Sequence, residues 1–271
     1  MASGAGPTSA PHREAALITG ASSGIGLALA RLFAADKRDL VLVARRREAL
    51  TQLADELQQT HGVSVNVLAA DLAEPDAATS LARALGAIGL SVNTLVNNAG
   101  IGVYGPFVES DPARETEMIR VNVIALTELT KKFLPAMVRL GRGQILNVSS
   151  TAAFQAGPLM SVYYATKAYV LSFSEALSNE TAGTGVTVTC LCPGPTITEF
   201  QKRAGVDQTR LFNSPWVMNA EDVARAGYEG MKKGKTLVIP GVMNRLMVQG
   251  VRLMPRKAVT QAARRIQEKR K

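Results

Sequence analysis

Cysteine, histidine and aromatic residues are scarce in this sequence of 271 residues. The two cysteines, Cys190 and Cys192, are too few for the disulfide framework of a small secreted domain. They lie two residues apart in an apolar run, where a strand would turn both to one face, and we interpret them as small core residues in a reducing compartment. The two histidines, His12 and His61, stand alone, so no metal site is expected.

Long apolar runs are also missing. A spanning helix needs about 18 or more apolar residues in succession, and no such stretch exists, so none is predicted. Residues 1–13 are small and polar and lack the apolar centre of a signal peptide, which predicts a disordered leader and a cytoplasmic protein. Hydrophobic residues make up 46% of the chain, which is enough for a sizeable core.

The positive charge is concentrated at one end. Nine Lys or Arg and one Glu lie between 242 and 271, and they account for eight of the net charge of +9. The remaining sequence is nearly balanced, so no nucleic-acid partner is expected for the main body.

Short β-branched runs alternate with helical patterns along the body. Strands are predicted at 15–20, 39–45, 63–71, 91–100, 143–150, 185–194 and 235–240. Helices are predicted at 24–35, 46–62, 75–88, 111–140, 163–182 and 220–232. Strands that are apolar throughout are typical of a parallel sheet covered on both faces. The alternation therefore predicts a single doubly wound α/β domain over 14–241, followed by a basic helical tail over 242–271.

A glycine-rich turn, Thr19–Gly26, ends the first predicted strand and opens a helix. Its glycines, Gly20, Gly24 and Gly26, permit unusual backbone angles and the close approach of a diphosphate. The first N–H groups of the helix attract the same anion. An ordinary glycine-rich turn is the alternative, but this position is the one that a dinucleotide-binding Rossmann fold requires.

Three arginines, Arg45, Arg46 and Arg47, follow the second predicted strand. NAD-binding folds of this design place an acidic residue there, whereas a guanidinium matches the 2′-phosphate of NADP. We therefore expect NADP(H) as the cofactor, with Arg45 as the first choice for the phosphate and Arg46 as the second. The alternative, that the arginines only solvate the start of a helix, accounts for one of the three.

Tyr163 and Lys167 stand four residues apart on a predicted helix and so share a face. A free phenol has a pKa of about 10, and a nearby ammonium lowers it, so that Tyr163 can exchange a proton while hydride moves. This spacing is common and indicates nothing by itself. Ser150, however, ends the fifth predicted strand, at the edge where ligands bind in such sheets, and can hold the substrate oxygen.

Together these motifs resemble the classical short-chain dehydrogenase/reductase family over residues 14–240 or so. The matching segments are Thr19–Gly26, Asp71, Asn97–Gly100, Asn122, Ser150, Tyr163 with Lys167, and Pro193–Thr198. The resemblance implies an oxidoreductase that moves hydride between nicotinamide and a carbonyl or alcohol carbon. It further implies a homodimer or homotetramer built from the helices near 112–140 and 163–182.

The resemblance also implies a role for each matching residue. Tyr163 is the general acid, Lys167 lowers the pKa of Tyr163 and binds the ribose, Ser150 orients the carbonyl, and Asn122 holds a water that relays protons. The implied cofactor-binding set is Gly20, Ser22, Ser23, Gly24, Ile25, Gly26, Arg45, Arg46, Asp71, Leu72, Asn98, Ala99, Gly100, Tyr163, Lys167, Pro193, Gly194, Thr196 and Thr198. Tyr164 falls about 100° away from Tyr163 around the helix and is interpreted as packing.

The substrate is expected to contact Ile101–Phe107, Ala153–Met160 and Phe200–Met218. These segments are rich in aromatic and methionine residues, which suits a bulky apolar ketone or aldehyde. The alternative is that half of these side chains only pack the loop against the body of the protein. Two rival functions are an NAD-preferring alcohol dehydrogenase and a non-enzymatic nucleotide sensor. The arginine triplet argues against the first, and the intact serine, tyrosine and lysine argue against the second.

The tail shows apolar residues at three-and-four spacing: Met243, Leu246, Met247, Gly250, Val251 and Met254. Such a pattern fits a basic amphipathic arm on an anionic membrane surface. It fits equally an extra helix that packs over the substrate loop or a neighbouring subunit, and we favour this second interpretation.

Overall fold

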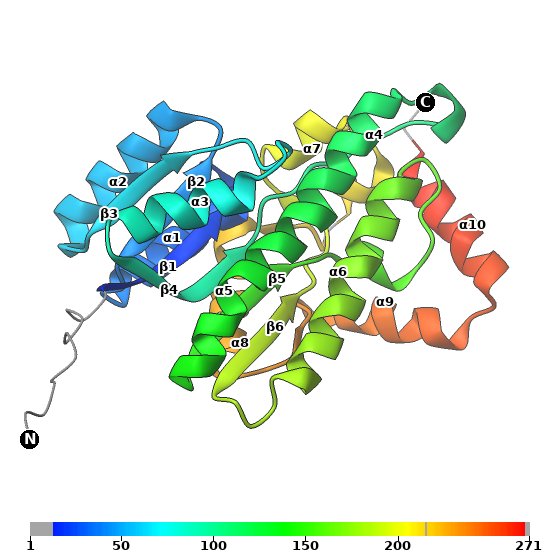
Figure 1. Ribbon diagram of the computed structural model, residues 1–271. Helices are drawn as coiled ribbons and strands as arrows, with labels where there is room; N and C mark the ends of the chain where they lie inside the picture. Colours follow the sequence, from blue (N-terminus) through cyan, green and yellow to red (C-terminus); the bar gives the residue numbers. More distant parts are fainter. Residues whose placement is uncertain (1–12, 215, 269–271) are drawn as a thin grey trace, which may run out of the picture.

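Seven parallel strands form the sheet that the apolar runs predict (Figure 1). The computed structural model describes residues 13–214 and 216–268. The strands are β1 (Arg13–Thr19), β2 (Leu40–Ala44), β3 (Val65–Ala69), β4 (Leu90–Asn97), β5 (Gly143–Val148), β6 (Val186–Leu191) and β9 (Leu237–Val238). Their order is β3-β2-β1-β4-β5-β6-β9, which confirms the doubly wound α/β fold and brings all carboxyl ends to one edge.

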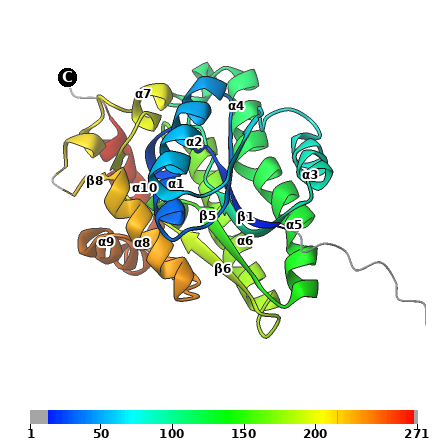
Figure 2. The same cartoon turned by 90° about the vertical axis from the view of Figure 1, so that its left-hand side faces the viewer.

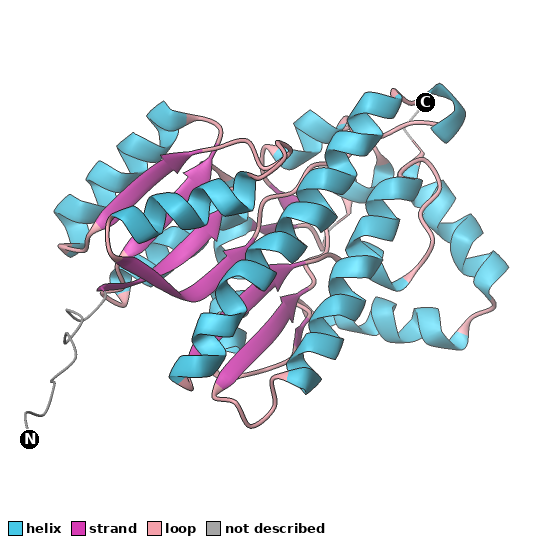
Figure 3. Cartoon of the chain, viewed as in Figure 1, coloured by secondary structure: helices cyan, strands magenta, loops and turns pink. Residues whose placement is uncertain are grey.

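Helices cover both faces of the sheet, as Figures 2 and 3 show. One face carries α1 (Gly24–Ala35), α2 (Arg47–His61) and α8 (Ala220–Lys232), and the other carries α3 (Ala77–Ala87), α5 (Leu126–Leu140) and α6 (Ser161–Glu180). Two apolar clusters fill the two interfaces, the first around Phe33 and Leu42 and the second around Leu95 and Leu129. Burial on both sides explains why the strands are apolar at nearly every position.

Several boundaries differ from the predicted ones. β1 begins at Arg13, the last residue of the predicted leader, and the rest of that leader, 1–12, lies outside the described residues. The last strand is reduced to two residues, Leu237–Val238, and within the described ranges it pairs only with the end of β6. A short parallel pair that the sequence did not predict, β7 (Thr196–Ile197) and β8 (Met218–Asn219), ties down the two ends of the loop that contains α7 (Phe200–Ala204).

The long helix predicted at 111–140 is divided by a π-helical turn. α4 (Pro112–Ile119) begins at the predicted cap, where the Asp111 carboxylate accepts a hydrogen bond of 2.9 Å from the amide of Ala113. The π turn, Arg120–Ala125, follows and leads into α5. Such turns are rare and often mark functional positions.

The tail forms two helices, α9 (Val242–Leu253) and α10 (Arg256–Gln267), separated at Pro255. α9 packs against the 3-10 turn Thr151–Phe154, and α10 packs against the 3-10 turn Arg210–Asn213. Both helices therefore lie over the end of the sheet where the predicted site is located (Figure 1). None of the helices in the described ranges is long and apolar enough to cross a bilayer.

Candidate active site

One cavity of about 900 Å³ opens at the carboxyl ends of the strands and extends to the tail. Nearly all predicted site residues line it, from the glycine turn to Thr198. Gly26 and Asn122 do not. The tail contributes residues from both helices, including Met247, Val251 and Val259.

The glycine turn has the backbone that its sequence predicts. Gly20 and Gly24 have φ of 65° and 56°, which a residue with a side chain rarely adopts. Gly26 is required by close packing. A Cβ at this position would lie 2.4 Å from the side-chain nitrogen of Asn98 and 2.4 Å from the carbonyl oxygen of Gly20. The turn and the helix therefore meet closely and present their N–H groups to the cavity.

Thr19 and Asn98 hold this turn from behind. The Thr19 hydroxyl accepts hydrogen bonds of 3.0 Å from the backbone amides of Asn98 and Ala99. The Asn98 side chain donates to the carbonyl oxygens of Thr19 at 2.8 Å and of Gly20 at 3.3 Å. Asn98, which the resemblance places in the cofactor-binding set, thus uses its side-chain amide to connect β4 to the glycine turn.

The arginines at the rim differ in their surroundings. Arg46 donates to the carbonyl oxygen of Ser22 at 3.2 Å and to its hydroxyl at 3.3 Å, and it pairs with Glu199 at 3.0 Å. Arg45 lies between two carboxylates, 3.3 Å from Glu117 and 3.8 Å from Asp71. Arg46, the second choice from sequence, is therefore the arginine beside the glycine turn, and with the Ser22 hydroxyl it fits a phosphate monoester.

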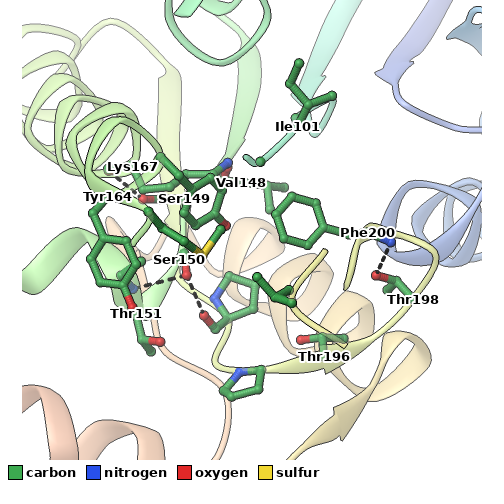
Figure 4. A pocket seen from close by; sticks show the side chains of 18 of the residues that line it. Ile101, Val148, Ser149, Ser150, Thr151, Tyr164, Lys167, Thr196, Thr198 and Phe200 are labelled. Carbon is green, nitrogen blue, oxygen red and sulfur yellow. Dashed lines mark hydrogen bonds between the residues drawn. The ribbon is translucent and has the colours of Figure 1, made fainter. Parts of the chain in front are cut away.

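Ser150, Tyr163 and Lys167 meet deeper in the cavity. The Lys167 ammonium donates a hydrogen bond of 2.9 Å to the carbonyl oxygen of Val148, and its nitrogen lies 5.7 Å from the centre of the Tyr163 ring. The Ser150 hydroxyl donates to the carbonyl oxygen of Pro193 at 3.4 Å and accepts from the amide of Ala152 at 3.1 Å. Figure 4 shows Lys167 and Tyr164 on one side of the pocket and Thr198 and Phe200 on the opposite side.

Burial controls the protonation of this group. It raises the pKa of the Tyr163 phenol well above its ordinary value, and hydrogen bonding to Ser150 opposes this rise only in part. It also lowers the pKa of Lys167 to about 8. In the chain by itself the pKa of Tyr163 is therefore raised, because loss of solvation of the charged form dominates; the lowering by Lys167 that the resemblance implies stays a prediction.

Asn122 lies beneath the cavity, in the π turn. Its amide nitrogen donates to the carbonyl oxygen of Ile101 at 2.9 Å and to the Thr166 hydroxyl at 3.1 Å, and its amide oxygen accepts from the Ile101 amide at 2.9 Å. These bonds attach the segment after β4 to α6. A Cβ at Gly100 would lie 3.4 Å from both the Asn122 oxygen and the Lys167 nitrogen, so this glycine keeps the space between the two side chains open.

The substrate side of the cavity is apolar. The Phe200 ring lies 5.4 Å from the Tyr163 ring, and Met160, Val206 and Phe212 belong to the same cluster. Each of the three predicted substrate segments contributes residues to the lining, for example Gly102, Gln155 and Leu211.

Sequence reasoning missed the contribution of α10. The Gln267 amide nitrogen donates a hydrogen bond of 2.6 Å to the Tyr164 hydroxyl, so Tyr164 has a polar partner in addition to its packing role. A signal was present: Val259, Ala263 and Gln267 recur every four residues and are the buried residues of α10.

Comparisons with known proteins agree with this geometry. A sequence model of the short chain dehydrogenase family matches residues 14–209. Sulfoacetaldehyde reductase 2 of Chromohalobacter salexigens is 40% identical over 214 residues, which are 77% of this chain and 84% of that protein.

Two solved structures extend the similarity to nearly the whole chain. A short-chain dehydrogenase from Sphingobium yanoikuyae in complex with NADPH is 35% identical with a TM-score of 0.78, covering 89% of this chain and 94% of that one. The bulky-bulky ketone specific alcohol dehydrogenase from Comamonas testosteroni is 30% identical with a TM-score of 0.74, covering 90% and 95%.

Proposed function

Because the chain belongs to the short-chain dehydrogenase family, we propose that it reduces a bulky apolar ketone or aldehyde to an alcohol with NADPH. The family assignment makes it an oxidoreductase that uses a nicotinamide cofactor and a small-molecule substrate. The observation that carries the proposal is the meeting of Ser150, Tyr163 and Lys167 in one cavity with the glycine turn.

The preference for NADPH rests on Arg46 and Ser22. Their guanidinium and hydroxyl lie together at the rim of the cavity, and the three residues directly after β2 are arginines, with no acidic residue among them to receive a ribose 2′-hydroxyl. Glu199, which pairs with Arg46, would give up this guanidinium to a 2′-phosphate. The similar structure with NADPH supports the same choice.

The chemistry follows from the protonation of the buried residues. The bound cofactor supplies the hydride. Tyr163, whose pKa is raised by burial, keeps its proton at neutral pH and donates it to the carbonyl oxygen as that oxygen gains charge. The Ser150 hydroxyl orients the carbonyl oxygen, and Lys167 holds the ribose and returns a proton to Tyr163, with Asn122 positioning the relay water.

The substrate class rests on the lining of the cavity beyond Tyr163. Phe200, Phe212, Met247 and Met254 line this space. Two charged groups of the cavity, Lys167 and Arg203, already have partners in the carbonyl oxygen of Val148 and in Glu199. An apolar lining of this kind suits a bulky carbonyl compound. The similar dehydrogenase that is specific for bulky-bulky ketones supports this choice.

Assembly into a homodimer or homotetramer remains part of the proposal. Exposed apolar side chains lie on α4 (Ile119), on α6 (Tyr169) and in the 3-10 turn before α4 (Phe107). We also propose that the tail serves the substrate cavity and not a membrane surface, and the support is that Met247, Val251 and Met254 line that cavity.

The test is reduction of a panel of aryl and alicyclic ketones by NADPH and by NADH. We expect Tyr163→Phe to lose about 10² to 10⁴ in rate. We expect Arg46→Ala to raise the KM for NADPH by about tenfold or more, and to leave NADH unaffected, because it removes a charge-assisted hydrogen bond. Arg47→Ala is the matched control, since Arg47 does not line the cavity.

Each rival predicts a different result. An NAD-preferring enzyme would use NADH at least as well as NADPH, and Arg46→Ala would change little. A nucleotide sensor would bind NADPH without turnover, and Tyr163→Phe would have no measurable effect.

A further inference from the structure

The carboxyl end of α10 is hydrogen-bonded to three segments of the chain, one of which, α6, lines the substrate cavity with Tyr164. The Tyr104 hydroxyl donates a hydrogen bond of 2.8 Å to the carbonyl oxygen of Gln267. The Gln267 amide nitrogen donates to Tyr164 at 2.6 Å, and the amide of Arg210 donates to the carbonyl oxygen of Glu268 at 3.4 Å. The last described turn of the chain is thereby connected to the segment after β4, to α6 and to the loop after α7.

Gln267 has one polar atom that these bonds do not use. Its side chain is buried, with 1% of the residue exposed, and the amide oxygen Oε1 has no hydrogen-bond partner among the residues that the structure describes. An amide oxygen in such a place is destabilising, because it has lost water and gained no donor in return. Gln267 lines the cavity, so a ligand in the cavity can supply the missing donor.

Tyr164 provides the complementary group. Its hydroxyl accepts the hydrogen bond from Gln267, so its own proton points elsewhere and can be donated. Tyr164 also lines the cavity, and its ring centre lies 6.1 Å from that of Tyr163. An acceptor and a donor are therefore adjacent, close to the residue that protonates the carbonyl.

The surroundings of this pair are apolar. Met160, Val206, Val259 and Ala263 line the same part of the cavity and offer no side-chain hydrogen bond. A polar pair in an apolar wall recognises one group and rejects molecules that lack it, since the pair would otherwise stay unsatisfied. A hydroxyl group is the smallest group that donates to Oε1 and accepts from Tyr164 at once.

We propose that Gln267 and Tyr164 form a hydroxyl-recognition subsite, and that the preferred substrate is an apolar carbonyl compound that carries a hydroxyl group on its apolar body. Gln267 and Tyr164 are then specificity-determining residues, distinct from the residues that transfer the proton. This inference rests on the proposed carbonyl reductase function and names its substrate class more closely.

The experiment uses a cyclohexyl-substituted cyclohexanone and its monohydroxylated derivatives, one for each position of the outer ring. We expect the full-length enzyme to reduce at least one derivative with kcat/KM about tenfold or more above that of the parent ketone. Gln267→Leu is expected to lower kcat/KM for the hydroxylated derivative more than for the parent ketone, so that the ratio of the two values falls to about 1. Tyr164→Phe is expected to reduce the preference for the hydroxylated derivative. The double variant is expected to show the same ratio of kcat/KM values as Gln267→Leu alone.

The matched control is Gln261→Leu, the same substitution at an exposed position of α10. A purely structural role of Gln267 would lower kcat/KM for both ketones together and leave their ratio unchanged, which would overturn the proposal. So would the absence of preference for every hydroxylated derivative in an active wild-type enzyme. If no ketone is reduced at all and Tyr163→Phe behaves like the wild type, it is the carbonyl reductase function that fails.

Discussion

The Thr19 hydroxyl offers the sharpest test of how the cofactor turn is built. Thr19 is buried, with 1% exposed, and its hydroxyl accepts from the amides of Asn98 and Ala99 and donates to the carbonyl oxygen of Val96 at 3.2 Å. Thr19→Val keeps the shape of the side chain but removes this hydroxyl. The backbone amide of Asn98 keeps its hydrogen bond of 3.1 Å to the carbonyl oxygen of Val96, whereas the backbone amide of Ala99 loses its hydrogen bond to Thr19.

The magnitude follows from these contacts. One buried donor without an acceptor costs about 1–3 kcal/mol, and the other lost hydrogen bonds add about 1 kcal/mol, so we expect Thr19→Val to lower the free energy of unfolding by about 2–4 kcal/mol. Thr19→Ser, the matched control, keeps the hydroxyl and removes a methyl group, at a cost of about 1 kcal/mol. Only Thr19→Val should also weaken NADPH binding, because Asn98 and Ala99 line the cavity.

The assay is urea denaturation of both variants, with NADPH binding followed by fluorescence. If Thr19→Val proved as stable as Thr19→Ser, the hydroxyl would not be satisfying these amides, and our account of the turn would be refuted. A loss of stability without any change in NADPH affinity would refute only the link to the cofactor.

Two further predictions concern Gly157 and Lys167. A Cβ at Gly157 would lie 2.2–2.4 Å from three carbons of the Tyr164 ring, so Gly157→Ala should destabilise the chain by about 1–3 kcal/mol and impair reduction of bulky ketones. In thermal unfolding, Gly86→Ala in α3 is the control, because nothing lies within 4 Å of its Cβ and the change should be neutral or stabilising by up to about 1 kcal/mol. Lys167 has a pKa lowered from 10.5 to about 8, so the unfolded chain binds more protons between these values and stability should rise with pH across this window. Relative to Lys167→Met, the wild type should gain about 3 kcal/mol from pH 8 to 10.5 in denaturation experiments; parallel pH profiles would contradict the buried position of this amine.

Local patterns were sufficient to predict most of the fold. The apolar runs correspond to the seven strands of the sheet, and the glycine turn lies where a strand passes into α1, because these features depend on residues close together in the sequence. The sequence did not reveal which arginine lies beside the glycine turn. Arg45 and Arg46 are neighbours in sequence, and only the packing against Ser22 and Glu199 separates their surroundings.

The remaining features depend on contacts between distant residues. The π turn forms where Asn122 bonds to Ile101 and Thr166, 21 and 44 residues away. The pKa of Tyr163 depends on how completely other elements bury it, which spacing to Lys167 does not reveal. The place of Gln267 in the cavity depends on its hydrogen bond to Tyr164, which no local sequence pattern predicts.

The connection between Gln267 and Tyr164 also bears on the order of assembly during synthesis. The two residues are 103 positions apart, and the glycine turn lies in the first tenth of the chain. Because a domain generally folds as a unit, this hydrogen bond can form only after the last turn of α10 has been synthesised. A chain halted before α10 would therefore contain the glycine turn, Ser150, Tyr163 and Lys167, yet lack the wall that we propose discriminates among ketones.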